Sequence, residues 1–448
     1  MQTTVHSERR AVASLASLYI TRMLGLFMVL PVLVVLGADY QGATPALLGL
    51  ALGVYGLTQA LLQIPLGLLS DFLGRKPVII AGLAVFALGS VTAATATSIE
   101  WLIIGRALQG AGAIAAAVMA LLTDLTSDEN RTKAMASVGA SIGVAFAMSL
   151  VLGPVIASVW GLAGIFWVTA CLAVMGILVA AFVVPKQPKS PVVEQGSAGS
   201  RLRTVLGHSQ LVRLDLGVFF LHFLMTALFV AVPGVLVQSA LPVAKHWQVY
   251  LPVMVIAFVA MVPLIILAEK RRKTKPVFLI AVASLCVSLL LMALVPASLV
   301  WAVVLLLVFF WGFNLLEATL PSLMSKTAPA GTKGAASGVY STCQFLGAFA
   351  GGAFGGWLLQ QYGSHAVFWL GAAVAAVWWL FSYSMSVPKP TQQVVVNLEG
   401  RSFEQLAEPL KRLNGVLEVT HLQELKAASL RVHSDEFQRG SLQALGLQ

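Results

Sequence analysis

Long apolar segments recur along this chain and constrain its fold more than any other feature. A bilayer core about 30 Å thick needs roughly 20 apolar residues per helix. Only 10% of the residues are charged and 58% are hydrophobic, which excludes a soluble globular domain. The segments also lack the strict alternation of a membrane β-barrel. We therefore expect an all-α membrane bundle with twelve spans, at residues 11–37, 46–70, 78–98, 101–124, 134–158, 164–185, 213–238, 246–268, 277–297, 299–325, 334–360 and 366–387.

The net charge of +10 indicates membrane topology rather than a nucleic-acid partner, because of where the basic residues lie. With the N-terminus placed in the cytoplasm, the Lys and Arg residues of the loops fall on the cytoplasmic side, and only Lys245 falls on the other. This bias sets orientation, so we expect both termini on the cytoplasmic side of a bacterial inner membrane. The run "EKRRKTKP" (269–276) is interpreted as a topology anchor on anionic lipid.

Six spans precede a polar stretch rich in Pro, Ser and Gly, and six follow it. The halves carry similar loops at corresponding places, "SDFLGRKPV" (70–78) and "AEKRRKTKPV" (268–277). A bundle with internal repeats is typical of secondary transporters, whose site lies between the halves. We expect an N-terminal six-helix bundle over 1–185, a cytoplasmic linker over 186–212 and a C-terminal six-helix bundle over 213–388.

Residues 389–448 predict a small cytoplasmic α+β domain. The segment 392–400 is typical of a strand, 402–416 of a helix that begins after Ser402, "VLEVTHL" and "LKAASLRVH" of two further strands, and "DEFQRGSLQAL" of a second helix. The order βαββα is that of a ferredoxin-like domain. His421 and His433 are interpreted as surface residues rather than metal ligands. The domain is interpreted as a regulatory or interaction module, and a passive appendage is the alternative.

One stretch, "GLLSDFLGRKPVII" (67–80), interrupts the apolar sequence with charges and glycines. Gly74 permits a tight turn between two antiparallel helices, and Asp71 and Arg75 have i,i+4 spacing. Lys76 and Arg75 also suit a positive anchor on the cytoplasmic side. A positive anchor alone does not require Asp71.

This stretch resembles the signature loop of the major facilitator superfamily, and "LIIGRALQGAGA" (102–113) and "TDLTSDENRTKAM" (123–135) resemble its helix-four motif and the loop that follows. "TRMLGLFMVLPVLVVLG" and "GFNLLEATLPSL" are similar to the YajR-type branch, which carries a C-terminal ferredoxin-like domain. The resemblance implies a charge latch that holds the halves together when the transporter is open outward, in which Asp71 meets the N-terminus of helix eleven and Arg75 pairs with Asp124. A rigid turn is the alternative. The latch set is Gly67, Asp71, Gly74, Arg75, Lys76 and Asp124.

Helix five departs from the glycine pattern frequent in drug/proton antiporters of this superfamily. In "SLVLGPVIAS" (149–158), Gly153 and Pro154 are kept, whereas Ser149, Ala157 and Ser158 replace the outer glycines. Small residues persist, so close packing is retained, but the departure weakens antiport as an interpretation.

Four ionisable residues lie well inside predicted spans, away from the span ends, and such residues are functional candidates by default. Arg22, Arg106, His222 and Glu317 lie one each in helices 1, 4, 7 and 10, which line the central cavity in the superfamily. Counting about 1.5 Å per residue places Arg22, His222 and Glu317 in one layer near the midplane, and Arg106 nearer the periplasm.

We expect Glu317, with His222 nearby, to carry a coupling proton. An acid in apolar surroundings binds its proton more tightly than in water, and histidine titrates near neutrality. Arg22 would be the counter-charge or an anchor for a substrate anion. Two alternatives stay open, a static Glu317–Arg22 salt bridge and direct substrate contact by Glu317. Arg106 either takes part in proton movement, as the resemblance implies, or extends to the interface.

Polar and aromatic residues near these charges are candidates for the substrate cavity, namely Asn314, Trp311, Phe313 and Gln109. Interhelical hydrogen bonding or lipid-facing packing is the alternative for each.

Together these features predict a proton-coupled secondary transporter, acting as an efflux antiporter of small, amphipathic molecules. A proton-coupled importer or facilitator, and a ligand sensor reporting through the C-terminal domain, are the rival hypotheses. The sequence has no Walker motif to bind ATP, and no nucleophile–base pair or metal-ligand spacing of an enzyme. The expected partners are the lipid bilayer, protons and a small-molecule substrate, with the proton gradient in place of a cofactor. A monomer is expected, with the C-terminal domain available for interaction.

Overall fold

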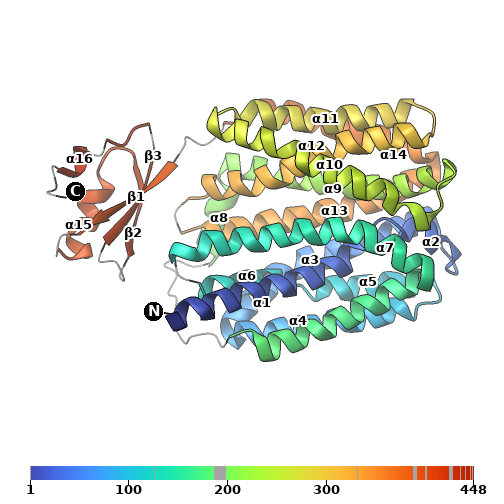
Figure 1. Cartoon of the computed structure of the whole chain (residues 1–448), viewed down its shortest axis with the longest axis horizontal. Coiled ribbons are helices and arrows are strands. Elements are labelled where there is room, and N and C mark those ends of the chain that lie inside the picture. Colours follow the sequence, from blue (N-terminus) through green and yellow to red (C-terminus); the bar gives the residue numbers. More distant parts are fainter. Residues whose placement is uncertain are drawn as a thin grey trace.

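The computed structural model describes residues 2–126, 128–185, 198–329, 331–386, 391–398, 401–422, 427–433, 435–438, 440–443, 445 and 447. The first part of the expected linker, 186–197, lies outside these residues. In the described part of the chain, nine helices are long and apolar enough to cross a membrane. The helices run along the long axis of the molecule, and a small sheet lies beyond one end of the bundle (Figure 1).

The N-terminal half contains α1 Gln2–Phe27, α2 Leu33–Leu36, η1 Gly37–Asp39, α3 Pro45–Leu73, α4 Arg75–Ala94, α5 Ile99–Ala111, α6 Ala115–Asp124, α7 Asp128–Leu178 and the π-turn η2 Val179–Val183. Two predicted spans, 134–158 and 164–185, fall on α7 and on η2, which continues it. Gly161 separates them, because its positive φ of 64° breaks the helical path. Gly74 likewise has φ of 91° between α3 and α4, which confirms the predicted tight turn.

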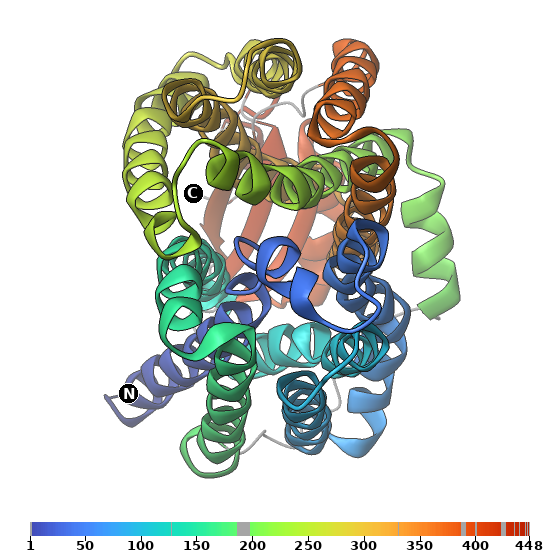
Figure 2. The ribbon, with the colours of Figure 1, turned by 90° about the vertical axis from the view of Figure 1, so that its right-hand side faces the viewer.

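The C-terminal half contains α9 Ser209–Gln238, η3 Val243–Lys245, α10 Trp247–Lys270, α11 Thr274–Leu294, α12 Leu299–Thr327, α13 Lys333–Tyr362 and α14 Ser364–Tyr383. Part of the expected linker is ordered: α8 Ala198–Leu206 packs against α9 and α13. Viewed along the bundle, the two halves face each other (Figure 2). We call the end that carries Gly74 and faces the small sheet the domain end, and the other, with η1, the opposite end.

The halves pack most closely between α3 and α13 near the opposite end. A Cβ built on Gly53 would lie 2.6 Å from the Phe349 carbonyl oxygen, and one on Gly49 would overlap the Gly352 carbonyl. Nearer the domain end the contact between these helices is looser, since a Cβ on Gly338 would lie 4.0 Å from Ile64 of α3 and one on Gly334 would meet no atom within 4 Å. Bare glycine backbone therefore packs the opposite end closely, and the α3–α13 contact loosens toward the domain end.

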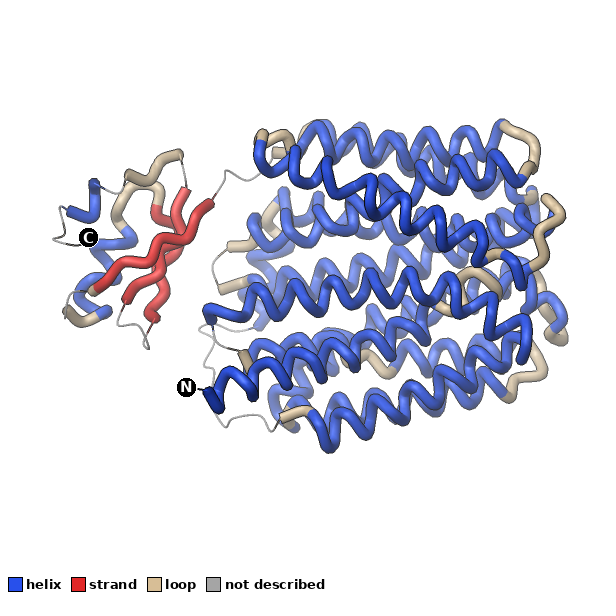
Figure 3. Tube along the Cα trace, viewed as in Figure 1, coloured by secondary structure: helices blue, strands red, loops and turns tan. Residues whose placement is uncertain are grey.

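The C-terminal residues form a sheet with helices on one side (Figure 3). Its elements are β1 Thr391–Asn397, α15 Phe403–Lys411, β2 Val416–Leu422, β3 Ala427–His433 and α16 Gly440–Gln443. The strands have the order β1-β3-β2 and are antiparallel, with Val394 opposite Leu430 and Val396 opposite Ala428. These side chains are buried with Leu406 and Leu410 of α15, because alternate strand residues face the helix. The second predicted helix is shorter than expected.

This sheet meets the bundle through two polar contacts. Arg272, at the α10–α11 turn, pairs with both carboxylate oxygens of Asp435 at 2.9 Å. Arg431 of β3 donates to the Lys326 carbonyl oxygen at the end of α12, at 2.9 Å. Both contacts are with the C-terminal half. Arg272 belongs to the basic run that the sequence assigned to lipid contact, so that interpretation is incomplete.

Candidate functional site

Three polar side chains from three helices meet inside the C-terminal half. The Nε2 atom of His222 (α9) lies 3.8 Å from Oε2 of Glu317 (α12) and 2.8 Å from the side-chain nitrogen of Gln344 (α13). The His222 side chain is 7% exposed and that of Glu317 is 34% exposed. The structure thus brings together two residues that the sequence placed in one layer, and adds Gln344.

The hydrogen bonds define which His222 nitrogen can exchange a proton. Nδ1 lies 3.2 Å from the Val218 carbonyl oxygen, which only accepts, so Nδ1 carries a hydrogen. In the neutral ring Nε2 is then an acceptor for the amide of Gln344. Protonation would place a hydrogen on Nε2, the atom nearest the Glu317 carboxylate. The geometry therefore permits a proton to be held by either residue of this pair.

Glu317 and its neighbour Asn314 have unused hydrogen-bonding capacity. Neither Oε2 of Glu317 nor the amide nitrogen of Asn314 has a hydrogen-bond partner, although both atoms are buried. A buried polar atom without a partner is costly, so a ligand or proton that engages these atoms gains from their satisfaction. Asn314 remains a cavity candidate on this ground.

An aromatic cluster lies beside this polar site toward the opposite end. Phe313 contacts the His222 ring edge-on, with centroids 6.1 Å apart. Phe146 of α7 in the N-terminal half contacts Phe313, Phe310 and Phe229 of the C-terminal half, with centroids 6.0 to 6.3 Å apart. The cluster joins the two halves through apolar surface, so Phe313 separates the polar site from the closed opposite end.

Arg22 does not join the His222–Glu317 pair. It is buried, and it donates to the side chain of Gln59 on α3, which in turn donates to Gln63 at 3.2 Å. Among the described residues no ion pair joins Arg22 to Glu317, so the static salt bridge considered above is wrong for this conformation. Equal depth along two helices does not fix which way each side chain points.

Arg106 lies fully buried in a network of its own. It donates to the Ala51 carbonyl oxygen at 3.2 Å and to Gln109 at 2.8 Å, and it lies over the Tyr55 ring at 5.1 Å. Gln109 donates onward to the Ser90 hydroxyl at 2.8 Å. Extension of Arg106 to the interface is therefore wrong, because its side chain is 0% exposed. Gln109 is engaged by this network rather than by the polar site.

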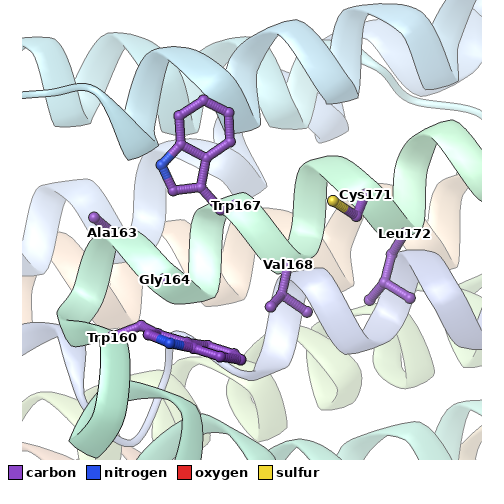
Figure 4. Close-up of a pocket in the computed structure, with 7 residues that line it drawn as sticks. All are labelled: Trp160, Ala163, Gly164, Trp167, Val168, Cys171 and Leu172. Atoms are coloured by element: carbon purple, nitrogen blue, oxygen red, sulfur yellow. The ribbon is translucent and has the colours of Figure 1, made fainter.

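The Trp311 indole nitrogen donates to the Ala260 carbonyl of α10 at 3.4 Å, so this side chain packs toward α10 rather than joining the polar site. A surface depression elsewhere also has no link to the polar site. Figure 4 shows its lining, which comes from α7 alone and includes Trp160, Trp167 and Cys171. Trp160 is 64% exposed, as expected for a helix face turned to lipid.

The residues of the proposed latch are only partly joined. Arg75 contacts Asp71 and reaches Asp124 at 3.4 Å and the Ser70 hydroxyl at 2.7 Å, all within the N-terminal half. The Asp71 side chain is 47% exposed, and its ion pair is with Arg75 rather than with a group on α13. Lys76 donates to the Val184 carbonyl at 2.8 Å, and a Cβ on Gly67 would lie 3.0 Å from the Cβ of Ala116.

Sequence reasoning missed one intramembrane acid. Asp215, six residues into α9, is 4% exposed, and neither carboxylate oxygen has a hydrogen-bond partner. It lies close to the start of a predicted span, where an acid is usually solvated. The signal that could have found it is its place inside the apolar run rather than before it.

The sequence is similar to those of known transporters. A model of the Major Facilitator Superfamily matches residues 15–352. The chain belongs to this superfamily. It is 46% identical over 430 residues to the "Inner membrane transport protein YajR" of Escherichia coli, which covers 95% of each chain. It is also 34% identical to an uncharacterized transporter of Buchnera aphidicola, over 77% of this chain and 89% of that one. These members of the superfamily are named transporters and not enzymes.

Solved structures of the superfamily share the fold. The human organic anion transporter MFSD10 superposes with a TM-score of 0.63 at 20% identity, covering 84% of this chain and 99% of that one. The nucleoside transporter NupG superposes with a TM-score of 0.66 at 14% identity, over 84% and 99%. A bacterial homolog of the lysosomal transporter Spinster, titled inward-facing and unoccupied, has a TM-score of 0.63 at 15% identity, over 85% and 98%. The chain is a membrane transporter by family.

Proposed function

We propose that the protein is a proton-coupled secondary transporter of an inner membrane, which exports small amphipathic molecules by antiport. The observation that carries this proposal is the 3.8 Å approach of Glu317 to His222 within the bundle. A partly exposed acid beside a buried imidazole can bind a proton that a cationic or hydrogen-bonding substrate displaces. Moving one charge through about 100 mV is worth about 2.3 kcal/mol, which suffices to drive uphill export.

Alternating access would move the two halves about this site. Close packing of Gly53 on Phe349 supports a state closed at the opposite end. The exposed Asp71, unpaired with α13, supports an open latch in the same state. In the other state Asp71 would meet the N-terminus of α13, where a helix favours negative charge. With both termini in the cytoplasm, the present state would be the one open to the cytoplasm.

Similarity to the superfamily supports further parts of the proposal. The bundle is proposed to contain twelve spans as a monomer, with residues 389–448 as a ferredoxin-like domain, which the strand order β1-β3-β2 supports. Similarity to a protein named for the inner membrane supports that location. The aromatic side chains next to Glu317, of which Phe313 is one, supply apolar surface for an amphipathic substrate.

Flux measurements in proteoliposomes test the proposal. The purified chain would be reconstituted with an imposed pH gradient, and uptake of tetraphenylphosphonium, ethidium and benzoate would be followed. We expect accumulation of a cationic probe on the acidic side, against its own gradient, as antiport requires. Accumulation on the alkaline side would indicate import, equilibration alone would indicate a facilitator, and binding without flux would indicate a sensor. Each of these three results contradicts proton-driven export.

A further inference from the structure

Asp215 and Tyr340 lie between the polar site and the domain end of the bundle. Helices α9 and α13 both begin at the domain end and run side by side, since Cβ atoms on Gly347 and Gly351 would meet the carbonyls of Phe219 and Phe223. Four residues earlier on each helix, this register places Asp215 of α9 level with Cys343 of α13. Tyr340 is about one turn nearer the domain end than Gln344, the His222 partner.

Both side chains are buried and lack hydrogen-bond partners. The Asp215 carboxylate oxygens and the Tyr340 hydroxyl are each without a partner, and these residues are 4% and 5% exposed. Packing alone does not account for two unsatisfied polar groups at one level of the bundle, because each one costs free energy. A protonated acid lowers that cost, since it carries no charge.

Within the part of the chain that the structure describes, no charged side chain is hydrogen-bonded to Asp215. Cys343 and Tyr340 face it from α13, and Tyr340 is also within electrostatic range of Glu317 on α12. On its own helix, Arg213 is engaged with the Ser384 carbonyl of α14 at 2.6 Å. Helix α8 brings Arg201 and Arg203 toward this end, and neither is hydrogen-bonded to Asp215.

We infer that Asp215 is a second proton-binding site, and that Tyr340 relays protons between it and Glu317. This inference rests on the proposed proton coupling. In the relay, the Glu317 carboxyl gives its proton to the Tyr340 oxygen while the Tyr340 hydroxyl proton passes to the Asp215 carboxylate. One proton moves toward the domain end and Tyr340 is unchanged. The three groups are not hydrogen-bonded to one another in this conformation, so side-chain rotation would make and break the relay.

Infrared difference spectroscopy between low and high pH tests the second site without a substrate. Purified wild type is expected to show separate carbonyl bands from Asp215 and Glu317. Asp215→Asn should lose one band, Glu317→Gln should lose the other, and Asp39→Asn should lose neither. Asp39 is the matched control because it makes the same change at an exposed position of the opposite end.

The outcomes separate the two proposals. Loss of a band only in Glu317→Gln would overturn the second site and leave the proposed function standing. Loss only in Asp215→Asn would overturn the coupling role of Glu317, and with it the relay. If Asp215→Asn does not fold, Asp215→Glu keeps the acid, and its band should shift in frequency; an unshifted spectrum would overturn the assignment.

Tyr340→Phe tests the relay itself. It keeps the ring and removes the unpartnered hydroxyl. Both acid bands should persist, and proton release after a rapid pH jump, followed by an indicator dye, should slow at least about tenfold. Ser341→Ala, a hydroxyl removal at the next position of α13, is the control. An unchanged rate in Tyr340→Phe would show that Tyr340 does not relay protons.

Discussion

The imidazole of His222 lies 3.8 Å from the carboxylate of Glu317, on neighbouring helices of the C-terminal half. Val218 fixes the ring through Nδ1, so the exchangeable position faces the acid. Phe313 covers the ring toward the closed end. The pair therefore lies on the domain-end side of Phe313, with the exchangeable nitrogen next to the partly exposed carboxylate of Glu317.

Removal of the imidazole should flatten the pH response of the transporter. His222→Gln can still hydrogen-bond Gln344 but cannot take up a proton. We expect flux of a transported probe to respond less to a change of pH than in wild type, because the variant has lost the nitrogen that can take up a proton beside Glu317. His365→Gln, a second histidine change outside this site, is the control. A pH profile of His222→Gln identical to that of wild type would remove His222 from the coupling pair.

Closure of the opposite end depends on backbone contact at Gly53. Any Cβ there would lie 2.6 Å from the Phe349 carbonyl, so Gly53→Ala should lower the free energy of unfolding by about 1–3 kcal/mol. Gly143→Ala should instead be neutral or stabilising by up to about 1 kcal/mol, since nothing lies within 4 Å of its Cβ. Thermal unfolding in detergent measures both. Equal behaviour of the two variants would contradict the close α3–α13 packing.

The latch predicts different effects for two of its residues. Asp71→Asn removes the i,i+4 pair with Arg75, which should destabilise the present state by no more than about 0.5 kcal/mol. The change should destabilise the state with the closed latch more, and so shift the population toward the present state. Labelling of Cys343 by a water-soluble maleimide, with Cys171 and Cys286 changed to Ala, should become faster. Arg75→Gln should also reduce thermal stability, because Arg75 joins Asp124 and Ser70 in the present state. Unchanged labelling in Asp71→Asn is what a rigid turn predicts, and either unchanged or slower labelling would contradict the latch.

The C-terminal domain should release from the bundle when its ion pair is broken. Arg272 and Asp435 are 62% and 48% exposed, so their attraction is weak and screened by salt. Arg272→Asp should raise hydrogen exchange at the end of α12, where Arg431 contacts Lys326. The double change Arg272→Asp with Asp435→Arg should restore protection, and Arg271→Asp should leave it unchanged. No rise in Arg272→Asp would mean that other contacts hold the domain.

Sequence patterns predicted most helical segments because their signal is local, but they missed the breaks at 28–32 and 112–114, which divide the predicted spans 11–37 and 101–124. The break at Gly161 and the turn at Gly74 lie where the apolar runs stop. The pairing of side chains was predicted less well, because helix rise gives depth but not direction. Glu317 and His222 share a layer and also face each other, whereas Arg22 shares that layer and faces Gln59.

The surroundings of two further residues could not be predicted from the sequence alone. Arg106 was assigned to either function or the interface, and its burial depends on partners far along the chain, the Ala51 carbonyl and the Tyr55 ring. Asp215 lies near a span end, where an acid is usually solvated, and its burial depends on the helices packed around α9. Tertiary contacts decide both cases.

Proton exchange on ligand addition tests the central claim most directly. Purified wild type and Glu317→Gln in weakly buffered detergent would receive tetraphenylphosphonium, ethidium and benzoate, with an indicator dye reporting protons and binding followed in parallel. Thermal unfolding would establish that the variant folds. We predict that at least one probe releases protons from wild type and none from Glu317→Gln. Binding without proton release in wild type, or release retained in full by the variant, would contradict coupling through Glu317.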